Sequence, residues 1–359
     1  MARKGAVETS VQEAYVLHEP FSVPDDGCAD RVLGCLLGGV VGDAFGYGVE
    51  FIKLPEIRRR FGPRGIQQPV LNPHGEAEVS DDTQMTLFTL EGLFAGISPN
   101  DSINQAKVLE AVRLATLDWH GAQIGRNRPR LEGNGLWKYA ILRKNQAPGM
   151  TCMRACQDRA RGTPDQPINN SKGCGGVMRV APIGLFAELS HEQAFELAAR
   201  CAAQTHSHPS GYLSTGFMAS MVRDLLEGLD PYRSAQRGLD LVRNWQDAEE
   251  TVAAVELAME LTERSNGDPA GAVERIGAGW IGEEALAIAL YSALVASNYS
   301  EAMSIASNHD GDSGSTASIA GQIYGAWKGP DEIPNAWIRR LDALDPLLDV
   351  MERLIRLRG

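Results

Sequence analysis

The sequence predicts one large all-α domain. From about residue 31 onward, apolar residues recur at the three- and four-residue spacing of amphipathic helices. Alternation typical of β-strands is scarce, and no low-complexity linker or internal repeat divides the 359 residues. We therefore expect a single helical domain over residues 31–359, preceded by an N-terminal arm over residues 1–30.

The arm lacks helical periodicity and contains Pro20 and Pro24. Two interpretations remain open for it. It is either a loosely docked tail, as terminal segments often are, or a segment that contacts a partner protein. In the second case its anchors would be Tyr15, Val16, Leu17 and Phe21.

The first helix of the domain, over residues 31–47, is apolar and rich in glycine. Its glycines recur every four residues and therefore lie on one helix face: Gly34, Gly38, Gly42 and Gly46. Glycine at this spacing lets another backbone approach closely, at about 1 kcal/mol per residue in helix propensity. Residues 315–327 also carry a face of small side chains, which favours tight packing at the centre of the domain.

The other helices are expected, in chain order, at residues 84–96, 102–119, 192–203, 212–229, 248–264 and 282–297. A closing amphipathic helix or helix pair follows at residues 331–357. Stretches rich in glycine, proline and asparagine at residues 61–79 and 161–176 predict loops.

The composition excludes several classes of function. The net charge is −12, from 34 basic and 46 acidic residues, so we expect no nucleic-acid binding through a phosphate-matching surface. The longest apolar run, residues 32–42, is too short to span a membrane, and no secretory signal is evident. The six cysteines form no CxxC pair, and Cys152 and Cys156 have the spacing of two buried thiols on one helix face. We expect a reduced, cytoplasmic protein.

Two acidic clusters lie far apart in the sequence, and each opens an apolar helix. The first is Ser80-Asp81-Asp82-Thr83, and the second runs from His309 to Thr316 with Asp310, Asp312 and Ser315. A helix N-cap is the alternative interpretation of the first cluster, but a cap needs only one such side chain. Carboxylates and hydroxyls form an all-oxygen ligand set, which favours Mg²⁺ or Mn²⁺ over zinc.

Two further segments are weaker candidates. Residues 170–179 form a glycine-rich turn that could hold a phosphate through backbone N–H groups, although the spacing is not that of a P-loop. His206 lies near the end of a helix, where it is either a solvent-facing cap residue or a ligand contact. Asp43 and Glu50, taken alone, are either capping, core or surface acids.

Together these segments resemble the ADP-ribosylglycohydrolase family. The resemblance runs from about Arg31 to about Gly329 and rests on six segments in order: residues 42–50, 80–83, 172–182, 205–206, 279–287 and 309–316. Any one of them could occur by chance, whereas all six in this order are highly specific. The resemblance implies an all-α fold with a metal-lined cleft and hydrolysis of the bond between ADP-ribose and a modified side chain, most often arginine.

The resemblance also implies roles for single residues. One Mg²⁺ or Mn²⁺ would be held by Ser80, Asp81 and Asp82, and a second by Asp312 and Ser315. Asp81, Asp82 and Glu50 would be catalytic, with Glu50 facing the ribose. The substrate would be bound by Lys172, Gly173, Cys174, Gly175, Gly176, Met178 and His206, with the diphosphate on backbone N–H groups.

The last motif departs from the family pattern at one position. Gly314 stands where the family usually has a second aspartate, so one carboxylate is missing. We expect weaker binding at one of the two metal sites, with Asp310 as a candidate substitute ligand. Cys174, where many relatives carry asparagine, removes a hydrogen-bonding side chain from the loop.

Two functions follow from this pattern. The first is an enzyme that removes ADP-ribose from modified protein side chains and so reverses an ADP-ribosyltransferase. The alternative is an immunity-type binding protein that antagonises a cognate transferase through residues 1–30, with weak or no hydrolysis.

Overall fold

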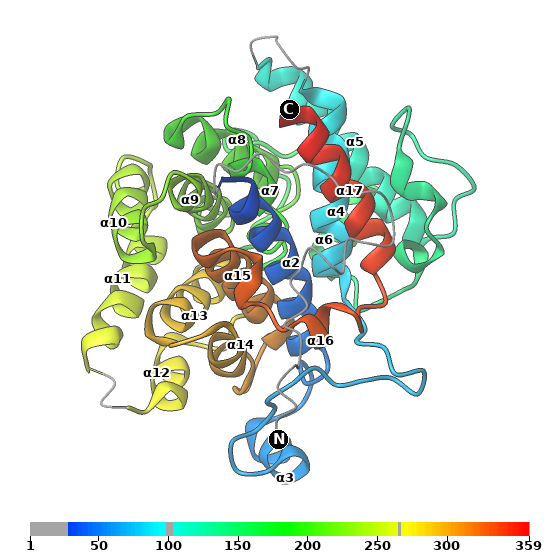
Figure 1. Cartoon of the computed structure of the whole chain (residues 1–359). Coiled ribbons are helices and arrows are strands. Elements are labelled where there is room, and N and C mark those ends of the chain that lie inside the picture. The colour runs from blue at the N-terminus through cyan, green and yellow to red at the C-terminus, as the bar shows by residue number, and fades with distance from the viewer. Residues whose placement is uncertain (1–27, 98–102, 265–266, 359) are drawn as a thin grey trace, which may run out of the picture.

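Two glycine-rich helices, α2 (Cys28–Tyr47) and α15 (Ser313–Lys328), cross at the centre of the molecule (Figure 1). A Cβ atom at any of four α2 glycines would overlap the backbone of α15. Gly34 faces Gly325, Gly38 faces Gly321, Gly42 faces Ala317, and Gly46 faces Ser313. The helices are therefore antiparallel and in close backbone contact, as the spacing of small residues predicts. The C-terminal end of α2 consequently lies beside the N-terminus of α15.

This computed structural model describes residues 28–97, 103–264 and 267–358, and the order of its elements is entirely helical. The remaining helices are α3 (Leu54–Phe61), α4 (Asp81–Gly96), α5 (Gln105–Gln123), α6 (Met150–Gln157), α7 (Ala181–Gly184), α8 (His191–Ala203), α9 (Pro209–Leu226), α10 (Pro231–Val242), α11 (Glu249–Arg264), α12 (Pro269–Ile276), α13 (Gly282–Val295), α14 (Tyr299–Ser307), α16 (Asn335–Ile338) and α17 (Leu344–Arg358). Three short 3₁₀ helices are η1 (Gly135–Lys138), η2 (Ala140–Arg143) and η3 (Pro330–Glu332). Extended pairing in the described ranges is limited to isolated bridges.

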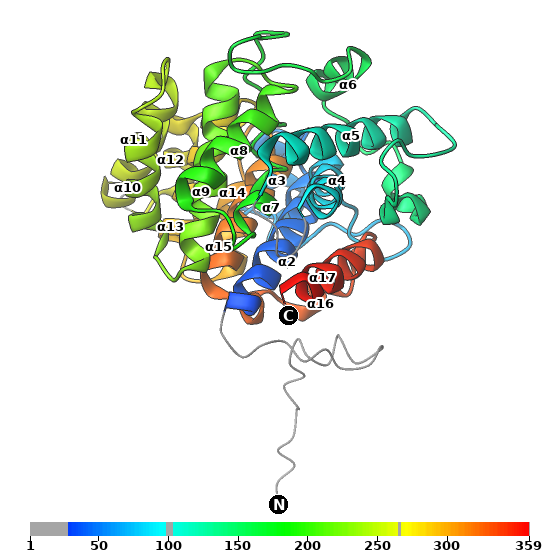
Figure 2. The same cartoon turned by 90° about the horizontal axis from the view of Figure 1, so that it is seen from above.

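Helices flank the central pair on two sides. In Figures 1 and 2, α4, α5 and α17 lie on one side of α2, while α9, α10, α11 and α13 lie on the side of α15. α13 and α14 pack directly on α15, and α4 packs on α5. One large apolar core runs through these layers, from Val32 in α2 to Leu354 in α17. The all-α fold class is confirmed.

Helix boundaries differ from expectation in a few places. α4 begins at Asp81 rather than after Thr83, so the acidic pair belongs to the helix itself. The closing segment is broken into η3, α16 and α17. Cys152 and Cys156 are both buried and lie on α6, as their spacing predicts. Of the predicted arm, residues 1–27 lie outside the described residues, and Cys28–Asp30 form the start of α2.

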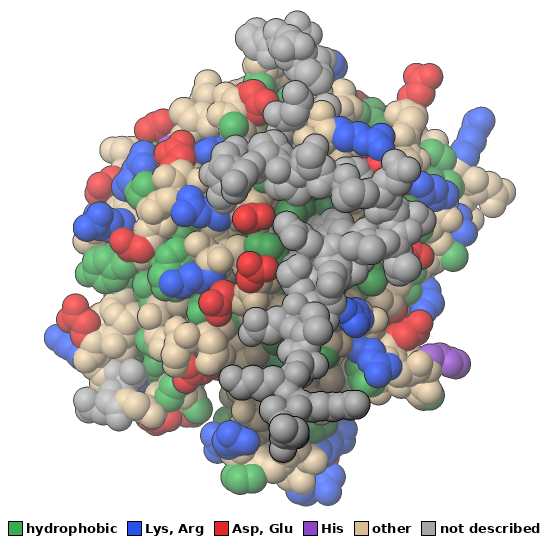
Figure 3. Space-filling view, viewed as in Figure 1, with side chains coloured by type: hydrophobic (Ala, Val, Ile, Leu, Met, Phe, Trp, Pro, Cys, Tyr) green, Lys and Arg blue, Asp and Glu red, His purple; other side chains and the backbone are tan. Residues whose placement is uncertain are grey.

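The visible surface carries charges of both signs. On the face shown in Figure 3, acidic and basic side chains are interspersed rather than segregated. Oppositely charged side chains on the described surface form short-range helix pairs, such as Glu196 with Arg200 at 2.7 Å. Exposed pairs of this kind each contribute about 0.3–0.5 kcal/mol. No helix within the described ranges is both long and apolar enough to cross a membrane.

Candidate active site

The acidic pair of the first cluster lies in the first turn of a buried helix. Ser80 is the N-cap of α4, because its hydroxyl accepts a hydrogen bond from the Asp82 N–H group at 3.1 Å. The cap interpretation therefore accounts for Ser80 but not for the two carboxylates that follow it. Asp81 accepts a hydrogen bond from the Gly149 N–H group at 3.0 Å, and both aspartates are buried.

Asp43, near the C-terminal end of α2, fixes this turn. Its Oδ2 atom accepts hydrogen bonds from the N–H groups of Ser80 at 2.9 Å and Thr83 at 3.1 Å, and from the Thr83 hydroxyl at 2.5 Å. Its Oδ1 atom is buried and has no hydrogen-bond partner among the described residues. Asp43 thus joins α2 to α4 and keeps one free carboxylate oxygen inside the protein.

The second acidic cluster meets the first at the N-terminus of α15. Asp312 is the N-cap of this helix and accepts a hydrogen bond from the Ser315 N–H group at 2.9 Å. The Ser315 hydroxyl in turn donates to Oδ1 of Asp82 at 3.3 Å. The structure therefore brings the two clusters together, and this contact depends on the close crossing of α2 and α15.

Five carboxyl groups crowd at this junction: Asp43, Glu50, Asp81, Asp82 and Asp312. Burial raises the pKa of all five, and repulsion between neighbouring carboxylates adds to the effect for Glu50, Asp81 and Asp82. The pKa is raised to about 6 for Asp43, about 8 for Asp81 and about 9 for Glu50. No ion pair to any of the five is found in the part of the chain that the structure describes.

The donor set fits a hard divalent cation. Within the described ranges, Oδ1 of Asp43 and Oδ2 of Asp82 are buried without hydrogen-bond partners. A nearby positive charge would relieve the repulsion among the five carboxylates. Carboxylate and hydroxyl oxygens are ligands that Mg²⁺ and Mn²⁺ accept. Among the described residues, no three His, Cys, Asp or Glu side chains are already arranged to hold an ion. The carboxylates would therefore have to draw closer around a bound metal.

Glu50 occupies the space that the missing aspartate would need. A Cβ atom built on Gly314 would lie 2.7 Å from Oε2 of Glu50 and 3.8 Å from Oδ1 of Asp312. The glycine thus leaves room for the Glu50 carboxylate to approach the N-terminus of α15. Glu50, rather than any residue of the second cluster, is the acid nearest to the vacated position among the described contacts.

Asp310 is directed elsewhere. Its Oδ1 atom accepts a hydrogen bond from the Leu54 N–H group at 2.6 Å, and its Oδ2 atom lies 3.6 Å from Nζ of Lys53. Its side chain is 51 % exposed. The expectation that Asp310 substitutes for the missing aspartate is therefore wrong, because it is used at the N-terminus of α3.

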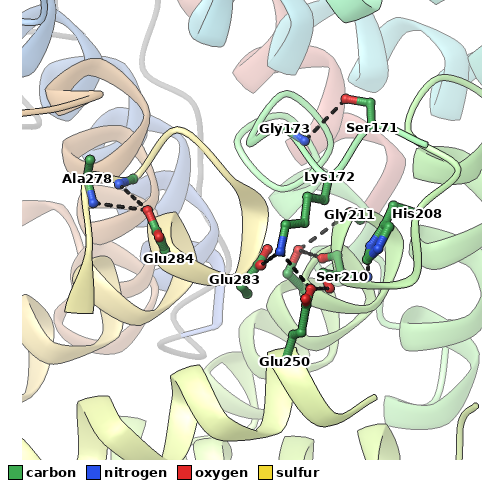
Figure 4. A network of polar contacts seen from close by, with 12 residues as sticks. Ser171, Lys172, Gly173, His208, Ser210, Gly211, Glu250, Ala278, Glu283 and Glu284 are labelled. Carbon is green, nitrogen blue, oxygen red and sulfur yellow. Dashed lines mark hydrogen bonds and ion pairs between the residues drawn. The ribbon is translucent and has the colours of Figure 1, made fainter. Parts of the chain in front are cut away.

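The glycine-rich loop at residues 172–178 is pinned to the start of α13. The Gly282 N–H group donates to the Lys172 carbonyl at 2.8 Å, and the Cys174 N–H group donates to the Trp280 carbonyl at 3.2 Å. The Lys172 ammonium group pairs with Glu250 and Glu283, each at 2.7 Å (Figure 4). Lys172 was predicted to bind substrate, but its side chain is engaged in this network.

His206 underlies the same loop. A Cβ on Gly175 would lie only 3.0 Å from Cε1 of His206, so the glycine lets the loop pack tightly on the imidazole ring. Nδ1 of His206 lies 2.9 Å from the Thr205 hydroxyl, which also accepts a hydrogen bond from Arg179 at 2.7 Å. Burial lowers the pKa of His206 to about 3, so the ring is neutral. The solvent-facing interpretation of His206 is therefore wrong.

The loop also reaches the N-terminus of α15. The Cys174 thiol donates to Oδ2 of Asp312 at 2.8 Å, and the Ser315 hydroxyl lies 3.7 Å from Sδ of Met178. Gly173 lies near His206, whose Nε2 atom would be 3.5 Å from a Cβ built on the glycine, and Gly176 packs near Thr215. The predicted loop residues and the predicted metal ligands consequently form one continuous site.

Two residues that matter here were not predicted as site residues. Asp43 holds the turn before α4, and its signal in the sequence is a lone acid within the apolar, glycine-rich run of α2. Arg179 is 4 % exposed and donates to Thr205 and to Cys152, with the latter sulfur at 3.4 Å. A buried arginine in an otherwise apolar segment is a comparable signal.

An exposed aromatic pair stands beside the carboxylates. Phe51, which follows Glu50, stacks on Trp280 with ring centroids 6.2 Å apart and an interplanar angle of 26°. The two side chains are 70 % and 45 % exposed. A separate surface hollow of about 740 Å³, between the α3 segment and α14, contains none of the predicted site residues.

The structure is an all-helical domain with an acidic centre at the junction of α4 and α15. The family model described as ADP-ribosylglycohydrolase matches residues 24–359, and the chain belongs to the ADP-ribosylglycohydrolase family. Members of this family release ADP-ribose by hydrolysis.

Similar proteins agree with this assignment. The chain is 25 % identical over 320 residues to the ADP-ribosyl-[dinitrogen reductase] glycohydrolase of Rhodospirillum rubrum, covering 87 % of this chain and 90 % of that protein. It is 22 % identical over 339 residues to the ADP-ribosylarginine hydrolase Tri1 of Serratia proteamaculans, covering 93 % and 81 %. A solved structure titled ADP-ribosylglycohydrolase-related protein complex aligns with a TM-score of 0.60 at 23 % identity, covering 92 % and 99 %, and shares the fold.

Proposed function

We propose that the protein hydrolyses the N-glycosidic bond between ADP-ribose and an arginine side chain of a target protein, with Mg²⁺ or Mn²⁺ at the junction of α4 and α15. The observation that carries this proposal is the meeting of four buried aspartates and the half-buried Glu50, with no ion-pair partner among the described residues. The names of two relatives, which refer to dinitrogen reductase and to ADP-ribosylarginine, support the choice of linkage.

Two groups of residues would hold the metal ions. Ser80, Asp81 and Asp82 are the ligands proposed for one ion, and Asp312 and Ser315 are the ligands proposed for the other. The contact between Ser315 and Asp82 at 3.3 Å supports a shared centre. A bound metal pair supplies a Lewis acid that activates water and orients hydroxyl groups.

Glu50 is the carboxylate proposed to face the reacting carbon. Cleavage of a glycosidic bond develops positive charge at the anomeric carbon, and a nearby carboxylate stabilises that charge. The same group can accept a proton from the attacking water. Its place beside Gly314 and Asp312, on a segment between α2 and α3, supports this role. Among the described residues no hydrogen bond to its carboxylate is found, so the group is not used to hold the fold together.

The loop at residues 172–178 is proposed to bind the diphosphate through backbone N–H groups, with His206 beneath it. The ion pairs of Lys172 with Glu250 and Glu283 support a backbone contact, since they occupy the ammonium group. Phe51 and Trp280 offer exposed ring faces at the edge of the site. An arginine guanidinium on such a ring gains about 0.5–1 kcal/mol at an exposed position.

The test is to incubate the purified full-length protein with an arginine-ADP-ribosylated protein, with Mg²⁺ or with a chelator, and to measure released ADP-ribose. Asp82→Asn keeps the side-chain shape and removes the charge, so we expect release to fall by at least about 100-fold, the scale of a lost catalytic metal contact.

Asp310→Asn is the matched control. This variant also replaces an aspartate of the acidic clusters by asparagine, but the Asp310 side chain points to the start of α3. Release of ADP-ribose should therefore remain near that of the unchanged protein. A serine-linked substrate is measured in parallel. Equal loss in both variants, or release only from the serine-linked substrate, would contradict the proposal.

A further inference from the structure

A buried chain of hydrogen bonds runs beneath the glycine-rich loop, from Arg179 through Thr205 to His206. The guanidinium group of Arg179 donates to the Thr205 hydroxyl oxygen at 2.7 Å, and that oxygen lies 2.9 Å from Nδ1 of His206. All three side chains are buried. The position of each proton in this chain is therefore set by neighbouring protein groups rather than by solvent.

The hydrogen bonds decide which nitrogen of His206 carries the proton. Burial and, to a smaller degree, the positive charge of Arg179 lower the pKa of His206, so the ring has a single N–H group. The Thr205 hydroxyl has one proton to donate, and arginine can only donate to it. Its other acceptor, the Ala202 carbonyl at 3.3 Å, already accepts the N–H groups of Thr205 at 2.9 Å and His206 at 2.8 Å. The hydroxyl proton therefore goes to Nδ1, and the ring proton is on Nε2.

The Nε2–H group faces the loop and has no acceptor among the described residues. Nε2 would lie 3.5 Å from a Cβ on Gly173 and 3.2 Å from a Cβ on Gly175, so the loop presents no side chain to it. The ring is only 2 % exposed, and a buried donor is normally paired with an acceptor. The unpaired N–H group therefore indicates a ligand that offers an acceptor oxygen.

Arg179 adds an unpaired positive charge to the same place. Besides Thr205, its guanidinium group contacts the sulfur atoms of Cys152 at 3.4 Å and Met85 at 3.9 Å. Within the described ranges, no carboxylate forms an ion pair with it. The Cys152 sulfur would lie 3.0 Å from a Cβ on Gly175, so the charge is close beneath the loop. Because a buried cation without a counter-ion is unfavourable, the expected ligand is an anion.

We propose that Arg179 and Thr205 hold His206 in its Nε2–H tautomer, so that the imidazole donates a hydrogen bond to a diphosphate oxygen on the loop. This rests on the proposed function, which places the diphosphate on residues 172–178. Arg179 and Thr205 are positioning residues that act through His206. The opposite tautomer would present a lone pair to the diphosphate and repel it, whereas a hydrogen bond to a charged oxygen is a strong one.

The tautomer is measured on full-length protein labelled with ¹⁵N-histidine. Long-range ¹H–¹⁵N correlation spectra distinguish a protonated from an unprotonated ring nitrogen, and His206→Gln identifies the signals of this ring among the seven histidines. We expect a protonated Nε2 in the unchanged protein and in Thr205→Ser, which keeps the hydroxyl. Thr205→Val removes the hydroxyl, so both tautomers should appear. A protonated Nδ1 in the unchanged protein, or a single Nε2–H tautomer in Thr205→Val, would overturn the proposal.

The affinity for ADP, measured by calorimetry at a fixed Mg²⁺ concentration, tests the contact with the diphosphate. Thr205→Val should bind ADP roughly tenfold more weakly, the scale of a lost hydrogen bond to a charged group. Arg179→Gln should bind at least as weakly, and Thr205→Ser should retain the affinity. Thr116→Val is the matched control, because the hydroxyl of this buried threonine donates to the Val112 carbonyl of its own helix at 2.9 Å. It should bind ADP like the unchanged protein.

The outcomes separate this inference from the proposed function. Equal ADP affinity in Thr205→Val and the unchanged protein, or no binding of ADP at all, would overturn the contact with the diphosphate. ADP lacks the reacting ribose, so hydrolysis enters neither measurement. An inactive protein with the expected tautomer and the expected ADP affinities would contradict the proposed function and leave this inference in place.

Discussion

Gly314 and Glu50 form a coupled pair at the residue scale. The glycine removes a carboxylate from the N-terminus of α15, and Glu50 occupies the adjoining space with Oε2 only 2.7 Å from where a Cβ would stand. The carboxyl group of Glu50, from the segment after α2, thus lies where the motif at the start of α15 lacks its second aspartate. The exchange keeps a carboxyl group at the junction but moves it onto a segment outside the helix.

This coupling makes a prediction for Gly314→Asp. The added carboxylate supplies a ligand directly from α15, so we expect Mg²⁺ affinity to rise by roughly tenfold, at the lower end of the effect of a changed ligand shell. Because the new Cβ overlaps Oε2 of Glu50, the Glu50 side chain must shift. Isothermal titration calorimetry of the metal-free protein measures the affinity.

Gly314→Asn is the control for shape, since it introduces the same crowding without the charge. It should displace Glu50 without tightening Mg²⁺ binding. Unchanged affinity in Gly314→Asp would show that the glycine does not weaken a metal site.

At the scale of whole helices, the contact of α2 with α15 determines where the acidic residues of the site lie. It joins the end of α2, which carries Asp43, to the start of α15, which carries Asp312. The four-residue glycine spacing predicted that another backbone packs closely on α2. Glycine lowers helix propensity, so four glycines on one helix face indicate a close backbone contact.

We predict that Gly38→Ala destabilises the protein strongly. Its Cβ would overlap the carbonyl of Gly321, and backbone cannot move aside, so the free energy of unfolding should fall by about 3 kcal/mol or more. Urea unfolding followed by circular dichroism measures this change. Gly39→Ala, one residue further along, meets the side chain of Gln322 instead and should cost less. Equal losses in the two variants would argue against backbone contact as the cause.

Other elements could not be predicted from the pattern. α3, α12 and α14 are eight or nine residues long, too short for a clear periodic signal. α10 has an apolar face of only a few residues among arginines and polar side chains. These helices form because the rest of the fold offers them a surface to pack on.

In the site as well, the local motifs predict some features, while others depend on residues far away in the sequence. The motifs indicated that the two acidic clusters meet, and Ser315 at the start of α15 does contact Asp82 at the start of α4. The metal-binding roles of Asp81, Asp82, Asp312 and Ser315 stay predictions. The directions of Asp310 and Lys172 could not be read from the motifs. Each depends on a partner far away in the sequence, Leu54 for the first and Glu250 and Glu283 for the second.

Folding of the whole molecule brings several carboxyl groups together at its centre, where burial and mutual repulsion disfavour their charged forms. A group whose pKa is raised by folding binds its proton more tightly in the folded state, so its stabilising effect is full below the unfolded pKa and is lost as pH rises through the folded pKa. For Asp43, Asp81 and Glu50 the window runs from about pH 4 to the folded values of about 6, 8 and 9. Metal-free protein should therefore lose stability as pH rises through this range.

We predict that Mg²⁺ offsets this loss. The difference in melting temperature between protein with Mg²⁺ and protein with chelator should be small at pH 6 and grow steadily towards pH 9, because the carboxylates must lose protons before they can bind the ion. Differential scanning calorimetry across this pH range measures the difference. A difference that stays constant with pH, or shrinks as pH rises, would show that the buried carboxyl groups are not the metal ligands.

The interlocked backbones of α2 and α15 also limit how the molecule can move. Neither helix can slide along or roll over the other without driving a carbonyl group into a glycine Cα, so this pair is a fixed frame. Any movement that lets a bulky substrate reach the site must then occur in segments attached to this helix pair. The Glu50–Phe51 segment and the turn that carries Trp280 lie outside this helix pair and meet through the stacked Phe51 and Trp280 rings.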